Sequence, residues 1–311
     1  MVTQMAYYTH QMHYHKGEPN PGLCSGRLSQ QYQVNCFSCV EASRLNFLYF
    51  NQDRLRCETY QGISDAVVHG AATGRDVGIK KSLPASHIGG KRYMQQNYHD
   101  RMAIACAYGP PHKFTTFTCN PNWDEIEDAL RFEPGQKASY RSDIVVRVFH
   151  MKLQEYLSDI KEGRIFGSVC AVAHSNEFQK RGLPHSHILV WQCDTGREPS
   201  AEDIDTYISV ELPDPSMDPL GFSLVQEFMI HGPCGPFNPN SQCMKNGKCT
   251  KNYPKPFRID TSFDPEGYPL YRRQDNRITV WKNGVQLDNR WVVPHNLAVP
   301  KKYQAHINVE A

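Results

Sequence analysis

A stripe of apolar residues at helical spacing marks residues 142–163. Its members recur three and four positions apart: Ile144, Val145, Val148, Phe149, Leu153, Tyr156, Leu157 and Ile160. Such a stripe is typical of an amphipathic helix that packs against a core. Ser142 or Asp143 can cap the first turn, and Gly163 can end the helix. The spacing therefore predicts a helix over about 142–162.

Stretches rich in β-branched and aromatic residues predict strands on both sides of this helix. Residues 114–119 (FTTFTC) come before it, and the string NPNW after them supplies a turn. Residues 168–178 (SVCAVAHSNEF) come after it and are joined to the apolar string HILVW by the turn KRGLP, which favours a hairpin. The order strand, helix, strand, strand predicts an α+β fold in which an antiparallel sheet is backed by helices.

The pattern changes on both sides of this core. Residues 1–25 have no apolar period, and we expect them to form a disordered lead-in. Residues 26–108 show helical spacings and predict a mainly helical N-terminal part. The core is expected over 109–228 and includes a helix of about ten residues that ends near Glu211. Residues 229–311 combine a Cys-rich segment with short strands that are separated by NG and DN turns.

His185 and His187 lie two positions apart in the second strand of the predicted hairpin. Because side chains alternate between the faces of a strand, both imidazoles should point the same way. Glu177 and Gln179 share a face of the preceding strand, and either could lie beside the pair. The Glu177 carboxylate is the better ligand for Mg²⁺ or Mn²⁺. An H-x-H pair alone is often only an exposed strand face, but with the carboxylate and the turn it predicts a divalent-metal site.

A second group of metal-ligating residue types lies between residues 228 and 257. His231, Cys234, Cys243 and Cys249 fall in a stretch that is rich in Gly, Pro and Asn and poor in apolar residues. Such a loop needs another source of order, and a tetrahedral Zn²⁺ held by one His and three Cys would supply it. The alternative is a surface loop with three free thiols.

Composition limits the classes of function. Lys and Arg number 34 and Asp and Glu 32, so the net charge of +2 does not indicate nucleic acid, and any binding face must be local. The eleven cysteines, in a chain with no secretory signal, favour a reducing intracellular compartment and thiols that are free or metal-bound. No apolar run is long enough to cross a bilayer, so no membrane partner is expected. No G-x-x-x-x-G-K-[ST] loop is present, so no ATPase is predicted.

The string EFQKRGLPHSHIL (177–189) resembles the histidine–hydrophobe–histidine motif of the Helitron helicase-like N-terminal family, the Rep-type (HUH) endonuclease region of rolling-circle transposons. RLSQQY (27–32), KFTTFTCNPNW (113–123) and HINVE (306–310) resemble further strings of this family in the same order. Ser186 stands where many members of the wider superfamily have a bulkier apolar residue. The resemblance implies a palm-like Rep fold. It also implies a metal, held by the two histidines with Glu177 or Gln179, that polarises a scissile phosphate.

The resemblance further implies single-stranded DNA as the partner, a nuclear location in a eukaryote, and a tyrosine that forms a 5′-phosphotyrosine bond. In the family, a tyrosine pair follows the HINVE string, so we expect the nucleophile beyond Ala311 and a truncated, inactive chain without it. The expected DNA contacts are Lys113, Lys180, Arg181 and Lys251. Two alternatives remain open: a non-catalytic, zinc-stabilised DNA-binding module, and a metal-dependent hydrolase with a water nucleophile.

Overall fold

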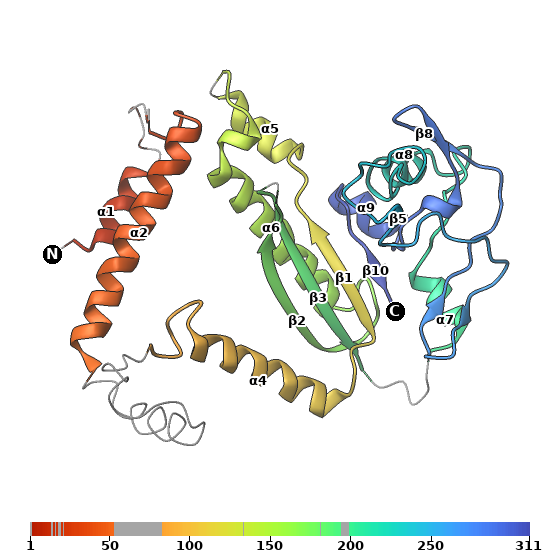
Figure 1. The fold of residues 1–311 in the computed structure, drawn as a ribbon, viewed down its shortest axis with the longest axis horizontal. Helices are drawn as coiled ribbons and strands as arrows, with labels where there is room; N and C mark the ends of the chain where they lie inside the picture. Colours follow the sequence, from red (N-terminus) through yellow and green to blue (C-terminus); the bar gives the residue numbers. More distant parts are fainter. Residues whose placement is uncertain are drawn as a thin grey trace. The chain divides into compact units, whose positions relative to one another are not determined.

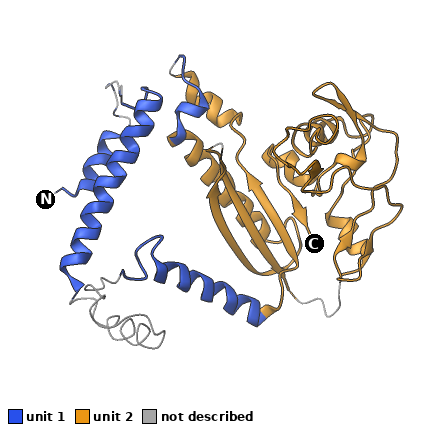
Figure 2. Cartoon of the chain, viewed as in Figure 1, with its two compact units in different colours: residues 1–107, 133–142 blue, residues 108–132, 143–311 orange. Residues whose placement is uncertain are grey.

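The computed structural model describes residues 2–13, 15, 17, 20, 22–52, 83–132, 134–180, 182–193 and 199–311 (Figure 1). The chain divides into two compact units (Figure 2). The first unit comprises residues 1–107 and 133–142, and the second comprises residues 108–132 and 143–311.

The first unit is helical. Its elements are α1 (Gln4–Gln11), α2 (Arg27–Phe50), α4 (Lys91–Tyr108) and the 3₁₀ helix η2 (Ala138–Tyr140). The disorder expected over residues 1–25 is therefore wrong for α1. The Thr3 hydroxyl caps this helix by accepting a hydrogen bond from the backbone N–H of Ala6 at 3.1 Å. The Gln30 amide donates to the Ser139 carbonyl at 2.7 Å, which ties α2 to η2.

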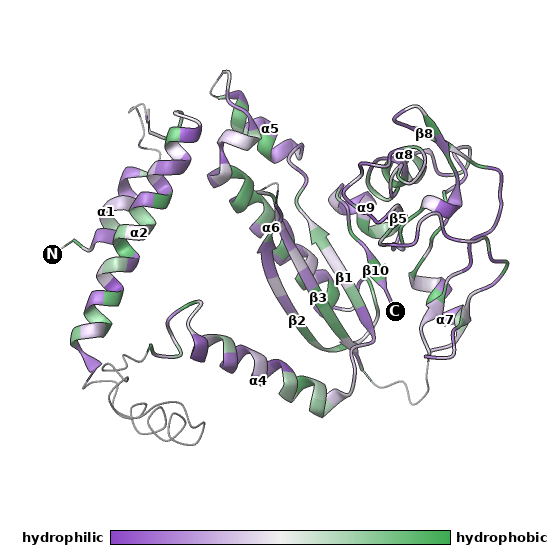
Figure 3. Ribbon diagram, viewed as in Figure 1, coloured by the Kyte–Doolittle hydropathy of each residue, from purple (hydrophilic) through white to green (hydrophobic). Residues whose placement is uncertain are grey.

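A four-stranded antiparallel sheet lies at the centre of the second unit, with the strand order β10-β1-β3-β2 (Figure 1). Its strands are β1 (Lys113–Thr118), β2 (Val169–Phe178), β3 (Pro184–Gln192) and β10 (Val309–Glu310). β2 and β3 form the predicted hairpin, and Gly182 takes a positive φ of 82° in its turn. Figure 3 shows hydrophobic residues on the central strands β1 and β3. The α+β class predicted from the sequence is confirmed.

Helix α6 (Ser142–Lys161) covers one face of this sheet. Phe117 of β1 lies against Phe149 and Tyr156 of α6, with ring centroids 5.7 and 5.1 Å apart. Thr115 of β1 shares a 2.7 Å hydrogen bond with the Tyr156 hydroxyl. The residues of β3 on this face are fully buried: Ser186, Ile188 and Val190. The predicted helix is confirmed, and Gly163, with a φ of 75°, follows its end.

The rest of the second unit consists of short elements. The helices are α5 (Asp124–Arg131), α7 (Ala201–Tyr207), α8 (Pro219–Phe228), η3 (Asn289–Trp291) and α9 (Ala298–Tyr303). The three small hairpins are β4 (Met244–Lys245) with β5 (Lys248–Cys249), β6 (Ser262–Phe263) with β7 (Pro269–Leu270), and β8 (Val280–Lys282) with β9 (Val285–Leu287). The helix expected to end near Glu211 ends at Tyr207, because the backbone of Ser209 is extended and forms an antiparallel β-bridge with His295.

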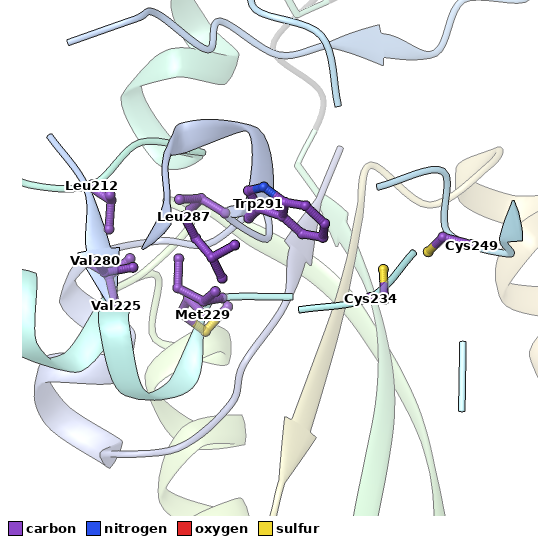
Figure 4. Packing of buried hydrophobic residues seen from close by; sticks show 10 residues of the cluster. Leu212, Val225, Met229, Cys234, Cys249, Val280, Leu287 and Trp291 are labelled. Atoms are coloured by element: carbon purple, nitrogen blue, oxygen red, sulfur yellow. The ribbon is translucent and has the colours of Figure 1, made fainter. Parts of the chain in front are cut away.

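These short elements enclose a second hydrophobic core. It contains Leu212, Val225, Met229, Val280, Leu287 and Trp291, and Cys234 and Cys249 belong to the same cluster. Figure 4 shows the two cysteines close together at one side of it, with Trp291 between them and the aliphatic residues. A loop that is poor in apolar residues is thus anchored to a packed core through its thiols.

The cysteines depart in one respect from the expectation of free or metal-bound thiols. Cys170 and Cys193 are joined in a disulfide, with their Cα atoms 4.9 Å apart. The antiparallel register explains their proximity, because Val169 at the start of β2 lies opposite Gln192 at the end of β3. The other described cysteines form no disulfide.

Among the residues that the structure describes, no helix is both long and apolar enough to cross a membrane.

His295 makes the stability of this unit sensitive to acid. Its ring is fully buried, and burial lowers its pKa to about 4. The unfolded chain, with a His pKa near 6.5, therefore binds the proton first, and stability is lost as the pH falls from about 6.5 toward 4. The Val293 carbonyl accepts a hydrogen bond from the His295 imidazole at 2.9 Å. The variant His295→Asn keeps a donor for this carbonyl, but its amide does not titrate.

Between pH 7 and pH 5, we expect the free energy of unfolding of the wild-type chain to fall by about 2 kcal/mol more than that of His295→Asn. Urea unfolding at the two pH values measures this difference. Equal losses in the two proteins would contradict it.

Candidate metal centres and their shared cavity

The hairpin β2–β3 brings three predicted ligands together on the sheet face opposite α6. Glu177 lies directly across from His185 in the strand register, and His187 is two positions farther along β3. The ligand atoms of the three residues all lie within 4.8 Å of one another. The Glu177 carboxylate is 3.0 Å from Nε2 of His187. One acidic and two imidazole groups therefore converge at one point.

The environment of His185 favours its metal-binding form. Burial, with a smaller contribution from the neighbouring His187, lowers the pKa of this imidazole to about 4. The ring is therefore neutral at neutral pH, as a metal ligand must be. Thr118, directly opposite on β1, places its hydroxyl 2.8 Å from Nδ1 of His185. A hydroxyl that accepts the Nδ1 proton leaves the Nε2 lone pair free for a cation.

Gln179, the alternative third ligand, lies just beyond the end of β2. Its backbone N–H donates to the Leu183 carbonyl at 2.9 Å, and the residue lines the cavity beside the two histidines. The structure thus sets the Glu177 carboxylate against His187 and leaves Gln179 on the cavity wall. His306 lines the same cavity, and its Nδ1 is held 2.6 Å from the Phe228 carbonyl.

A second group of potential ligands forms in the Cys-rich segment. The ligand atoms of His231, Cys234, Cys243 and Cys249 all lie within 4.8 Å of one another. The turn of the β4–β5 hairpin brings Cys249 back toward Cys243, and Thr250 N–H donates to the Cys243 carbonyl at 2.8 Å. One imidazole and three thiols are a donor set typical of structural zinc. This cluster could hold a metal ion such as zinc.

The thiols of the cluster differ in their proton affinity. Burial, together with the neighbouring thiols of Cys243 and Cys249, raises the pKa of Cys234 to about 12. Burial also tends to raise the pKa of Cys249. Hydrogen bonds from the backbone N–H groups of Tyr253 and Lys251, together with the two neighbouring thiols, outweigh burial and lower this pKa. Because thiolates are the ligand form, a metal ion that binds here displaces the thiol protons.

One cavity of about 1070 Å³ in the second unit is lined by histidines from both groups of ligands. His185 and His187 line it from the sheet, whereas His231, Lys251 and Tyr253 line it from the Cys-rich segment. Its walls thus come from segments far apart in the sequence. The separate motifs predicted neither this cavity nor the role of Thr118, because both depend on how β1, β3 and the Cys-rich segment pack.

The four expected DNA contacts have different outcomes. Lys180 and Lys251 are exposed, and Lys251 lines the cavity. Lys113 is only 3% exposed, and burial lowers the pKa of its ammonium group. This first residue of β1 is enclosed within the unit, which does not favour the phosphate contact predicted for Lys113. Arg181 lies outside the described residues.

Residues 7–190 match the family model of the Helitron helicase-like domain at N-terminus. This match covers more than half of the chain and includes Glu177, His185 and His187, so the chain belongs to this family. The match ends before the His/Cys cluster, which lies at positions 231–249. No curated protein matches the chain.

Proposed function

We propose that this chain is the Rep-type (HUH) region of a rolling-circle Helitron transposon, and that it binds single-stranded DNA and a divalent metal. The observation that carries the proposal is the convergence of Glu177, His185 and His187 on the sheet face opposite α6, within the part of the chain that matches the family. An antiparallel sheet with its ligand pair on a central strand is also what the palm-like Rep fold requires.

In this proposal Mg²⁺ or Mn²⁺ is held by the three side chains and acts as a Lewis acid on the scissile phosphate. His185 is positioned by Thr118 and by its burial, whereas His187 and Glu177 remain partly exposed, at 38% and 57% of their side chains. The carboxylate reduces the positive charge of the ion. The partial exposure leaves room for a phosphate to approach the metal from the cavity.

The proposed nucleophile is the tyrosine that the family carries shortly after the HINVE string. Phe114 of β1 pairs with Glu310 of β10, and Ala311 after it lines the cavity that contains the histidine pair. A tyrosine-bearing segment that continues from β10 would therefore begin at the wall of the cavity that the histidine pair also lines. Tyrosine attack transfers the phosphate to the phenol oxygen and leaves a free 3′-hydroxyl on the DNA.

For the second cluster we propose a structural Zn²⁺ held by His231, Cys234, Cys243 and Cys249. The supporting observation is that the four donors converge although His231 and Cys249 are eighteen positions apart in the sequence. A filled tetrahedral site orders a loop and needs no open position.

Incubation of the chain with labelled single-stranded DNA and Mn²⁺ tests the proposed function. We expect a retarded band in a native gel, weaker retardation of duplex DNA of the same sequence, and weaker binding by His187→Ala. In a denaturing gel we expect neither cleavage nor a protein-linked strand for residues 1–311 alone. A version extended past residue 311 should form the covalent adduct.

The other outcomes identify the alternatives. Cleavage without an adduct, lost in His185→Ala, would indicate a hydrolase with a water nucleophile. An adduct formed by residues 1–311 would place the nucleophile within them. The non-catalytic module would be indicated if DNA binding depended neither on metal nor on His185 and His187, and if the extended chain formed no adduct. The absence of any preference for single strands would contradict the proposal.

A further inference from the structure

The part of the cavity lining that comes from segment 251–258 is basic, although the chain as a whole is nearly neutral. Lys251, Lys255 and Arg258 line the cavity within eight residues of sequence. Among the described residues that line the cavity, Glu310 is the only one with an acidic side chain. Arg273 also lines the cavity, but it is 4% exposed and donates to the Val292 carbonyl at 2.9 Å, so it supports the fold. The positive charge available to a ligand is therefore concentrated on segment 251–258.

This basic wall is tied directly to the His/Cys cluster. Lys251 follows the ligand Cys249 by two positions, and the N–H of Asn252 donates to the Cys249 carbonyl at 2.9 Å. The Tyr253 ring stacks on His231, with centroids 4.2 Å apart and an interplanar angle of 18°. Lys255 N–H donates to the Arg290 carbonyl at 2.9 Å. The course of the wall is thus fixed by contacts to two of the four cluster residues.

An exposed aromatic side chain lies on the same cavity. Tyr268, in the turn before β7, is 64% exposed and lines the cavity together with Lys251 and Arg258. Basic groups combined with an accessible aromatic ring are the usual means of holding single-stranded nucleic acid, since phosphates contact the cations and bases stack on the ring.

We propose that segment 251–258, with Tyr268, is the strand-binding wall of the cavity, and that the His/Cys cluster holds this wall in position opposite the histidine pair. The inference rests on the proposed function and adds the surface that takes the DNA backbone. Lys251, Lys255 and Arg258 contact successive phosphates, while the sheet presents the metal ligands from the other side. This segment lies outside the residues that match the family, so the family match does not provide the assignment.

The test compares two variants of the full chain in binding to an oligothymidylate at several salt concentrations. Lys251→Gln/Lys255→Gln/Arg258→Gln removes the three wall charges. Lys245→Gln/Lys248→Gln removes two exposed charges from the β4–β5 hairpin that do not line the cavity. Glutamine keeps most of each side-chain stem, and circular dichroism with thermal melting verifies that both variants fold.

Each phosphate contact to a single strand contributes about 0.7 to the slope of log K against log salt. We therefore expect the magnitude of this slope to be smaller by about 2 in the wall variant, and its affinity for the oligothymidylate to be roughly 100-fold lower near 0.1 M salt. The hairpin variant should lose little of either. Cys234→Ser should weaken DNA binding as the wall variant does, yet keep the wild-type affinity for Mn²⁺ in the absence of DNA.

Equal losses in the wall and hairpin variants would overturn the inference, because they would show a general effect of charge. Full DNA affinity in Cys234→Ser would overturn the link between cluster and wall. Either result leaves the proposed function standing as long as the wild-type chain prefers single strands. If the wild-type chain shows no such preference, the proposed function fails, and the inference fails with it.

Discussion

Replacement of Cys234 by serine is expected to cause a large loss of stability in the second unit. Cys234 is fully buried and belongs both to the His/Cys cluster and to the hydrophobic core around Trp291. A metal ion that binds only the folded state stabilises it by about 4 kcal/mol when the free ion is a thousand times above its dissociation constant. Loss of one ligand removes most of that contribution, so the midpoint of urea unfolding should fall sharply.

The effect should depend on zinc. A strong chelator should bring the wild-type protein down to the stability of Cys234→Ser and should change the variant little. Cys106→Ser, at an exposed position of α4, is the matched control and should behave like wild type. If the chelator leaves the wild-type unfolding curve unchanged, the cluster does not hold a stabilising metal.

Replacement of either His185 or His187 by alanine is expected to abolish measurable Mn²⁺ binding at the sheet. Each supplies one of three ligands, and calorimetry with the metal alone measures the loss. Thr118→Val removes the hydroxyl beside Nδ1 of His185 but no ligand, and a change of this kind typically lowers metal affinity by about 10- to 100-fold. This graded response separates ligands from the residue that positions them.

Two further substitutions identify the third ligand and control for unspecific effects. Glu177→Gln should weaken Mn²⁺ binding strongly, whereas Gln179→Ala should have little effect; the reverse order would make Gln179 the ligand. His174→Ala is the histidine control. His174 is exposed on β2 and pairs with Ile188, a residue of the sheet face that packs on α6, so it lies on the face opposite the pair. A loss of binding in His174→Ala would contradict the site.

The parts of the fold that local patterns specify could be predicted. The stripe over 142–162 is long and regular, and an apolar face of that width determines which side of the helix packs against the core. The β2–β3 hairpin followed from its turn and its alternation, and its register then determines that Glu177 faces His185.

The remaining features depend on contacts between distant segments. Nothing in the string around Lys113 shows that its ammonium group is enclosed, and the end of α7 is set by the bridge between Ser209 and His295. The disulfide between Cys170 and Cys193 depends on the register at the open end of a hairpin. The cavity depends on the packing of distant segments, among them β10, which pairs with β1 and places Glu310 and Ala311 in the lining that also contains the histidine pair.

Anomalous scattering from crystals grown with Mn²⁺ and Zn²⁺ tests the central claim most directly. Data collected on both sides of each absorption edge distinguish the two metals by position. We expect a manganese peak among Glu177, His185 and His187 and a zinc peak among His231, Cys234, Cys243 and Cys249. Manganese absent from the histidine pair, in crystals that show it bound elsewhere, would contradict the proposed metal site and the Rep-type function built on it.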